Sequence, residues 1–228
     1  WAWASAQVTC QITDAKFSQV EHTADANTLA LYHFNGDLAD AAGKATDLRP
    51  MLKKAERQAH RFAPDAPAWM KSPSGSCLVL DGAEHFTVTL PPVENLATTP
   101  VSAEMMVYVR EFTGWGYEGN PQILGLANDW DSQLSWSQGT WDKANAPAFG
   151  KGISSAKFAK DFPRNRWCHV KISYDGKGAS TFAVDGEVWG KIDGQPFKPN
   201  LNQKPLTLSV GPLRGMVDEV RVQVGESK

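Results

Sequence analysis

The sequence lacks an excess of charge of either sign, and it lacks a long apolar run. Its 228 residues carry a formal net charge of −2, and acidic and basic residues are interspersed. The basic surface that nucleic acid or an anionic membrane would require is therefore missing. No apolar stretch approaches the roughly 20 residues of a membrane-spanning helix. We expect a soluble protein with no nucleic-acid partner and no membrane insertion.

Cysteine is scarce as well. The three cysteines, Cys10, Cys77 and Cys168, cannot all pair within one molecule, and no Cys-x-x-Cys motif suggests zinc or redox chemistry. At most one internal disulfide can form. Cys77 and Cys168 lie in apolar runs, where a buried thiol behaves as a small hydrophobic side chain. We expect at least one of them to be such a thiol.

Local catalytic motifs are also missing. The sequence has no Gly-x-Ser-x-Gly elbow, no His-Glu-x-x-His helix and no Gly-rich phosphate loop. Its histidines are scattered along the chain, at His22, His33, His60, His85 and His169. No class of enzyme is indicated by a motif of this kind.

The sequence is instead dominated by alternation of apolar and polar residues with a period of two, interrupted by turn residues. Asn35-Gly36 and Asp81-Gly82 are typical of tight turns. This pattern predicts an antiparallel sandwich of about ten strands. The predicted strands are Thr28–Phe34, Ser76–Leu80, His85–Leu90, Val101–Arg110, Gln122–Ala127, Gln133–Gln138, Trp167–Tyr174, Ser180–Val184, Leu206–Val210 and Met216–Val224.

One short segment has helical spacing instead. In Met51–Arg61, basic residues surround Leu52, Ala55 and Ala59 in the pattern of a helix with a solvated face. The proline-rich Pro64–Pro73 stretch that follows is predicted to be a loop. A chain of this length can bury a core as a single domain.

Two groups of segments occur in a characteristic order. The first half contains Leu29–Asp40, Leu78–Gly82 and Val101–Tyr108, and the second half contains the sequences Arg166-Trp-Cys-His-Val-Lys-Ile-Ser-Tyr-Asp-Gly176, Phe182-Ala-Val-Asp-Gly-Glu187 and Gly215-Met-Val-Asp-Glu-Val-Arg-Val222. In this order they resemble the bacterial laminin G-like jelly roll family. The resemblance covers about Thr28 to Val224, which implies an N-terminal extension over residues 1–27 and a jelly roll domain over residues 28–228.

The resemblance implies an all-β, concanavalin A-like antiparallel β-sandwich in which the first and last strands are adjacent. That pairing would remove two exposed sheet edges. It also implies a possible structural Ca²⁺, held by the turn at Asn35-Gly36, by Asp37 and by Asp218, since calcium takes several oxygen ligands. The alternative is that Asp218 accepts hydrogen bonds from the backbone or pairs with a basic residue. Glu219 is expected to pair with an arginine.

Glycoside hydrolases of this fold carry two carboxylates in a Glu-x-Asp-x-Glu strand. Glu104 lies on the corresponding strand, but no carboxylate follows two or four residues later. An inverting pair of Glu104 with Asp129 or Asp131 remains an alternative, as does a lyase that uses Tyr108 and Arg110. The simpler interpretation of the last two is a pair of side chains that stabilises the sheet.

Aromatic residues gather in the central part of the chain among Gly, Asn, Asp, Gln and Ser. Aromatic faces stack on sugar rings, and amides and carboxylates bind sugar hydroxyls. The predicted stacking residues are Trp115, Tyr117, Trp130, Trp136 and Trp141, with Asn128, Asp129, Asp131 and Gln133 as polar partners. The alternative is that these tryptophans belong to the core. Trp69, Trp167 and Trp189 are not expected to contact a ligand, and Trp167 is expected to pack against the core.

The sequence therefore predicts a non-catalytic carbohydrate-binding or cell-adhesion module, a lectin-like domain whose partner is a polysaccharide or glycoconjugate. The Ala-x-Ala pattern within Trp1–Gln7 resembles the end of a secretory signal, so we expect a secreted or cell-surface bacterial protein. Two alternatives remain open. One is a protein-interaction or structural module that binds another polypeptide or a second copy of itself. The other is a polysaccharide hydrolase or lyase.

Overall fold

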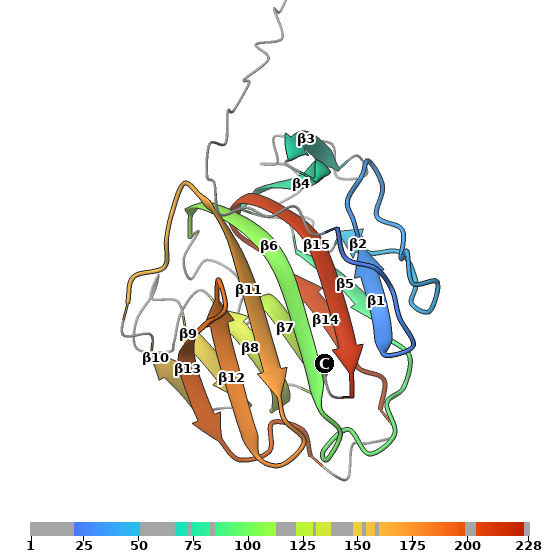
Figure 1. Ribbon diagram of the computed structural model, residues 1–228, viewed down its shortest axis with the longest axis vertical. Coiled ribbons are helices and arrows are strands. Elements are labelled where there is room, and N and C mark those ends of the chain that lie inside the picture. Colours follow the sequence, from blue (N-terminus) through green and yellow to red (C-terminus); the bar gives the residue numbers. More distant parts are fainter. Residues whose placement is uncertain are drawn as a thin grey trace, which may run out of the picture.

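The computed structural model describes residues 21–50, 67–72, 74–82, 85–112, 122–129, 131–137, 148–151, 154–157, 160–198 and 204–225. Within these ranges the chain forms strands β1 to β15, arranged as two antiparallel sheets (Figure 1). In the described ranges no helix has the length and the apolar character needed to cross a membrane. The fold is all-β, as the alternation of residues predicts.

The larger sheet has eight strands. Their order from edge to edge is β13 (Glu187–Asp193), β12 (Ala179–Val184), β11 (Trp167–Tyr174), β6 (Val101–Glu111), β15 (Arg214–Val224), β4 (Gly75–Asp81) and β3 (Ala68–Ser72), with β1 (Thr28–Tyr32) also paired to β15. Asp185 and Gly186 join β12 to β13 and both have positive φ angles, 50° and 81°. This is the turn geometry that matches the twist of a hairpin, and Asp-Gly adopts it readily.

The smaller sheet has seven strands and lies behind the first in Figure 1. Its order is β10 (Ser154–Lys157), β9 (Ala148–Lys151), β8 (Ser132–Ser137), β7 (Gln122–Asp129), β14 (Thr207–Val210), β5 (Phe86–Thr89) and β2 (Arg49–Pro50). Apolar side chains of both sheets, such as Val107, Ile172 and Leu126, form one buried cluster between them. Burial of this cluster is the main stabilising contribution.

The first and last described strands are adjacent, as the resemblance implies. Thr28 to Tyr32 pair with Gln223 to Val220, so that β1 (blue) lies beside β15 (red) in Figure 1. β15 bonds to β6 along its other edge. A β-bulge interrupts this second pairing between Asp218 and Arg221. Glu219 lies inside the bulge with a positive φ of 51°.

Most predicted strands are confirmed, and the Trp167–Tyr174 strand has the predicted bounds. The prediction of a loop over Pro64–Pro73 is wrong in part, because β3 forms there and pairs with β4. Strands β2, β9, β10 and β13 were not predicted either. The predicted helix Met51–Arg61 lies outside the described residues. Cys77 and Cys168 are both buried thiols, and burial raises the pKa of Cys77 to about 12.

Gly215 provides a first test of this packing. A Cβ atom at this position would lie 2.0 Å from the carbonyl oxygen of Tyr108 on the neighbouring strand β6. Gly215→Ala is therefore expected to lower the free energy of unfolding by about 2–3 kcal/mol, the upper part of the range for overpacking. Urea denaturation followed by tryptophan fluorescence measures the change. An unchanged unfolding free energy would mean that β6 and β15 are not packed this closely.

Candidate functional site

The outer face of the eight-stranded sheet carries the polar side chains with the most distinctive arrangement. On β6, Ala103, Met105 and Val107 point into the core, so that Glu104 and its alternate neighbours point outward. The same alternation on β11 places Val170 and Ile172 in the core and His169, Lys171 and Ser173 on the outside. Two adjacent strands therefore contribute to one outward-facing surface, which we call the outer face.

Glu104 lies at the centre of the outer face and is only 4% exposed. Its Oε2 atom is 2.9 Å from Nε2 of His169. Its Oε1 atom accepts hydrogen bonds from Nε and Nη2 of Arg221, at 2.8 and 2.5 Å. Burial alone would raise the pKa of Glu104, but the bonds from His169 and Arg221 outweigh it and lower that pKa to about 2. Glu104 is therefore ionised at neutral pH.

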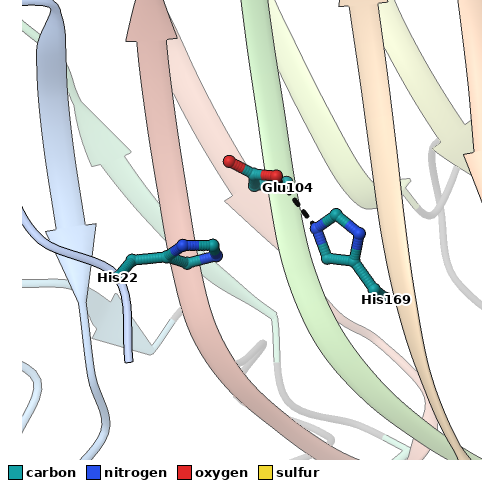
Figure 2. A group of neighbouring side chains, drawn as sticks. All are labelled: His22, Glu104 and His169. Atoms are coloured by element: carbon teal, nitrogen blue, oxygen red, sulfur yellow. Dashed lines mark hydrogen bonds and ion pairs between the residues drawn. The ribbon is translucent and has the colours of Figure 1, made fainter. Parts of the chain in front are cut away.

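His22 reaches the same place from the segment that precedes β1 (Figure 2). Its backbone N–H donates to Oε2 of Glu219 at 2.9 Å, which fixes the segment beside β15. Its ring centroid lies 6.4 Å from that of His169. Burial lowers the pKa of His22 to about 4 although Glu104 acts in the opposite direction. The imidazole of His22 is therefore neutral at pH 7 and keeps a nitrogen lone pair.

Glu219 does not pair with an arginine, so that expectation is wrong. Its Oε1 atom lies 2.9 Å from Nδ1 of His33, and Arg221 pairs with Glu104 instead. The β-bulge at Glu219 explains why Arg221, and not Glu219, shares a face with its ion-pair partner. An extra residue on one strand changes which side chains point to the same side.

A groove lies beside this cluster, at the start of β6 and the end of β11. Its volume is about 470 Å³, within the range of small-molecule sites. Hydroxyl and charged side chains line it, among them Ser102, Lys171, Ser173, Asp175, Lys177 and Thr181. The hydroxyls of Ser173 and Thr181 lie 2.7 Å apart. The groove therefore presents both hydrogen-bond donors and hydrogen-bond acceptors to solvent.

The other end of the outer face is aromatic. Tyr108 and Trp167 make an edge contact with ring centroids 5.9 Å apart, and Trp167 is buried in a small cluster with Cys77 and Met216. Trp167 is therefore buried, as expected, but in a second, smaller hydrophobic cluster that is separate from the main cluster between the sheets. Trp69 and Trp189 are partly buried against the main core.

Trp136 is not a stacking platform, and that prediction is wrong. The side chain is 0% exposed, and its ring lies 4.8 Å from that of Phe162 and 5.5 Å from that of Phe182, measured between centroids. It alternates with Gln133, Ser135 and Ser137 on β8, so the pleat directs it into the core. The other predicted stacking residues, Trp115, Tyr117, Trp130 and Trp141, lie outside the described residues.

The predicted polar partners lie on the seven-stranded sheet or beside it, away from Glu104. Asn128 and Gln133 are buried. Asp129 pairs with Lys204 at 2.6 Å, and Asp131 pairs with Lys198. Both carboxylates are thus paired with lysines. Their role in binding sugar hydroxyls stays a prediction.

The same positions bear on the hydrolase alternative. Glu104 faces outward from one sheet, whereas Asp129 ends β7 of the other, so the described structure does not bring the proposed inverting pair together. A carboxyl group with a pKa near 2 is also a poor proton donor at neutral pH. Glu104 therefore does not fit the role of the general acid in a glycosidase.

The carboxylates of the predicted calcium site, Asp37 and Asp218, are hydrogen-bonded within the protein. Asp218 accepts from the Ser74 hydroxyl and, at 3.0 Å, from the backbone N–H of Glu219. Asp37 accepts from the backbone N–H of Ala39 at 3.1 Å. The bond from Glu219 matches the alternative in which Asp218 accepts hydrogen bonds from the backbone. Calcium bound by Gly36, Asp37 and Asp218 stays a prediction.

Sequence reasoning missed His22, His169 and Arg221 as partners of Glu104. A signal was available on β11, where His169, Lys171 and Ser173 alternate with core residues and face away from them. His22 gave no such signal, because it belongs to the predicted N-terminal extension. Its position follows from tertiary contacts that no local pattern encodes.

The sequence matches the family described as "Concanavalin A-like lectin/glucanases superfamily" over residues 81–225. The chain therefore belongs to the concanavalin A-like lectin/glucanase superfamily, and the laminin G-like resemblance is confirmed. A comparison with curated proteins gave no match.

Solved structures with the same fold include two that are described as complexes with arabinotriose or SialylT. Domain 4 of an extracellular GH43 arabinanase from Geobacillus stearothermophilus, in complex with arabinotriose, has a TM-score of 0.60 and 20% identity, over 89% of this chain and 94% of that one. The binding domain of botulinum neurotoxin DC, in complex with SialylT, has a TM-score of 0.55 and 13% identity. That match covers 90% of this chain and 49% of the toxin domain, so the chain spans about half of it.

Botulinum neurotoxin type C, whose cell entry depends on two ganglioside molecules, is also similar. Its TM-score is 0.55 at 12% identity, over 90% of this chain and 49% of that one. At these identities the similarity establishes the fold and leaves the ligand of this chain to be argued from its own residues.

Proposed function

We propose that this protein is a non-catalytic carbohydrate-binding module of an exported bacterial protein, and that the groove on the outer face binds the glycan. The observation that carries the proposal is the open groove of about 470 Å³ lined by hydroxyl and charged side chains. The fold supports it, since neighbours of the same fold are described in complex with arabinotriose or with SialylT.

The groove has the chemistry that a sugar requires. Sugar hydroxyls both donate and accept hydrogen bonds, and Ser102, Ser173 and Thr181 can do the same. Lys171 adds a donor from β11 and Asp175 adds an acceptor at the strand end. The groove therefore offers a sugar both donors and acceptors, at the start of β6 and at the end of β11.

Stacking by Trp115, Tyr117, Trp130 and Trp141 stays a separate prediction. These residues lie in the central part of the chain, where the sequence is also rich in Gly, Asn, Asp, Gln and Ser. They would add a second contact region, since the flat face of an aromatic ring can pack on the apolar face of a sugar ring. The groove proposal does not depend on them.

The groove is tested by filling it. Ser173→Trp would place an indole in the groove and is expected to weaken oligosaccharide binding at least tenfold, because the ligand and the ring would occupy the same volume. Isothermal titration of the full chain against arabinose-containing, sialylated and β-glucan oligosaccharides measures the effect.

Thr89→Trp is the matched control, since Thr89 is an exposed strand residue of the other sheet. It should bind as the wild type does. Equal affinity of wild type and Ser173→Trp for every ligand that binds would contradict the groove, and the failure of the wild type to bind any saccharide would contradict the function.

A further inference from the structure

The cluster around Glu104 contains three side chains of the types that bind transition metals. A ring nitrogen of His22, a carboxylate oxygen of Glu104 and a ring nitrogen of His169 all lie within 4.8 Å of one another. Figure 2 shows the three side chains converging from the segment before β1, from β6 and from β11. We infer that His22, Glu104 and His169 form a binding site for a divalent transition-metal ion, with zinc as the best fit.

The ligand set selects the kind of metal. Two imidazoles and one carboxylate suit zinc and its first-row neighbours, whereas calcium and magnesium prefer oxygen ligands throughout. Ligand atoms around a tetrahedral zinc, at about 2.0–2.1 Å from the ion, are roughly 3.4 Å apart. The three ligand atoms already lie within 4.8 Å of one another. Small side-chain rotations that move each atom by about 1 Å would bring them to this spacing. This site is therefore distinct from the predicted calcium site at Asp218.

The surroundings hold the ligands in place. Arg221 binds Oε1 of Glu104 and leaves Oε2, the atom that faces His169, as the metal ligand. Such a partner orients a ligating carboxylate from behind. The backbone of His22 is fixed through Glu219. The ligands thus come from two paired strands and one anchored segment, so little ordering is needed when the ion binds.

The charge balance sets the expected strength. Glu104 supplies one negative charge, and Arg221 uses part of it, so the site is weaker than one with a free carboxylate. The side chain of His169 is 33% exposed, so solvent reaches this edge of the cluster, and three protein ligands would leave the fourth position of a tetrahedral zinc unfilled. Three protein ligands and an open position are the arrangement of zinc sites that also hold a water molecule or a substrate atom.

The test is a titration of the EDTA-treated full chain with ZnCl₂, followed by isothermal calorimetry, and with CoCl₂, followed by visible absorption. The wild type is expected to bind one ion per chain and to give the d–d bands of four-coordinate cobalt. His22→Gln and His169→Gln should each lower the affinity at least tenfold and abolish these bands.

His85→Gln is the matched control, because His85 is also a partly buried histidine but precedes β5 of the other sheet. It should bind zinc as the wild type does. Circular dichroism of each variant establishes that it is folded. The site is refuted if the wild type binds no zinc at millimolar concentration, or if both triad variants bind it with unchanged affinity. Neither result would bear on glycan binding in the groove.

Discussion

Trp136→Ala is expected to lower the free energy of unfolding by about 3–5 kcal/mol, the range for loss of a large buried aromatic side chain. The indole is fully buried and lies against Phe162, Phe182 and Phe112, whose ring centroids are 4.8, 5.5 and 6.3 Å away. Removing it leaves a cavity at the junction of both sheets that the rigid strands cannot close. Urea denaturation of the wild type and the variant measures the change.

Trp136→Phe is the control for this experiment. It keeps an aromatic ring in the site and should lose much less stability than the alanine variant. The opposite result would be an alanine variant as stable as the wild type that no longer binds a saccharide. Trp136 would then belong to an exposed binding surface, as the sequence alone suggested.

Glu104→Gln is expected to lower the free energy of unfolding by about 3 kcal/mol at pH 7. Removal of one partner from a buried ion pair leaves the other charge, here Arg221, without compensation. The lowered pKa gives the same size, since the fall from 4.5 to about 2 corresponds to about 3 kcal/mol at 1.36 kcal/mol per pH unit. Chemical denaturation at pH 7 measures it.

The pH dependence of this loss has a definite sign. The folded pKa of Glu104 is lower than the unfolded one, so its contribution is present above about pH 4.5 and is lost as the pH falls toward 2. The difference between wild type and Glu104→Gln should therefore shrink to about half by pH 3.

Glu111→Gln is the matched control for Glu104→Gln. Glu111 also lies on β6 and pairs with Arg214 at 2.8 Å, but more than half of each side chain is exposed. It should change stability by less than about 1 kcal/mol. A loss for Glu104→Gln that is no larger than this, or that does not vary with pH, would contradict the buried ion pair.

The sequence was sufficient to predict the sandwich. Alternation in Trp167–Tyr174 directs Cys168, Val170 and Ile172 inward, and the structure places them in the core. Strand β3 escaped prediction because Met70 and Lys71 are exposed at the sheet edge, where pairing with β4 and not alternation defines the strand. Its proline-rich surroundings favoured a loop.

The candidate site was much less predictable. Trp136 is surrounded in sequence by Gln, Ser and Asp, a polar context that suggested exposure. In a strand, however, neighbours along the chain point to the opposite face, so their polarity says nothing about the side chain between them. Glu104 was noted for its position on a strand, but its partners are 65 and 117 residues away. Only the three-dimensional pairing of β6, β11 and β15 reveals them.

The most direct test of the proposed function is to locate the bound saccharide by NMR, with the ¹⁵N-labelled full chain and the oligosaccharide of highest affinity. The groove proposal predicts that the largest amide shifts cluster at Ser102, Lys171, Ser173 and Thr181 on the eight-stranded sheet. Shifts confined to β7, β8 and their connecting segments, or no shift with any oligosaccharide, would contradict it.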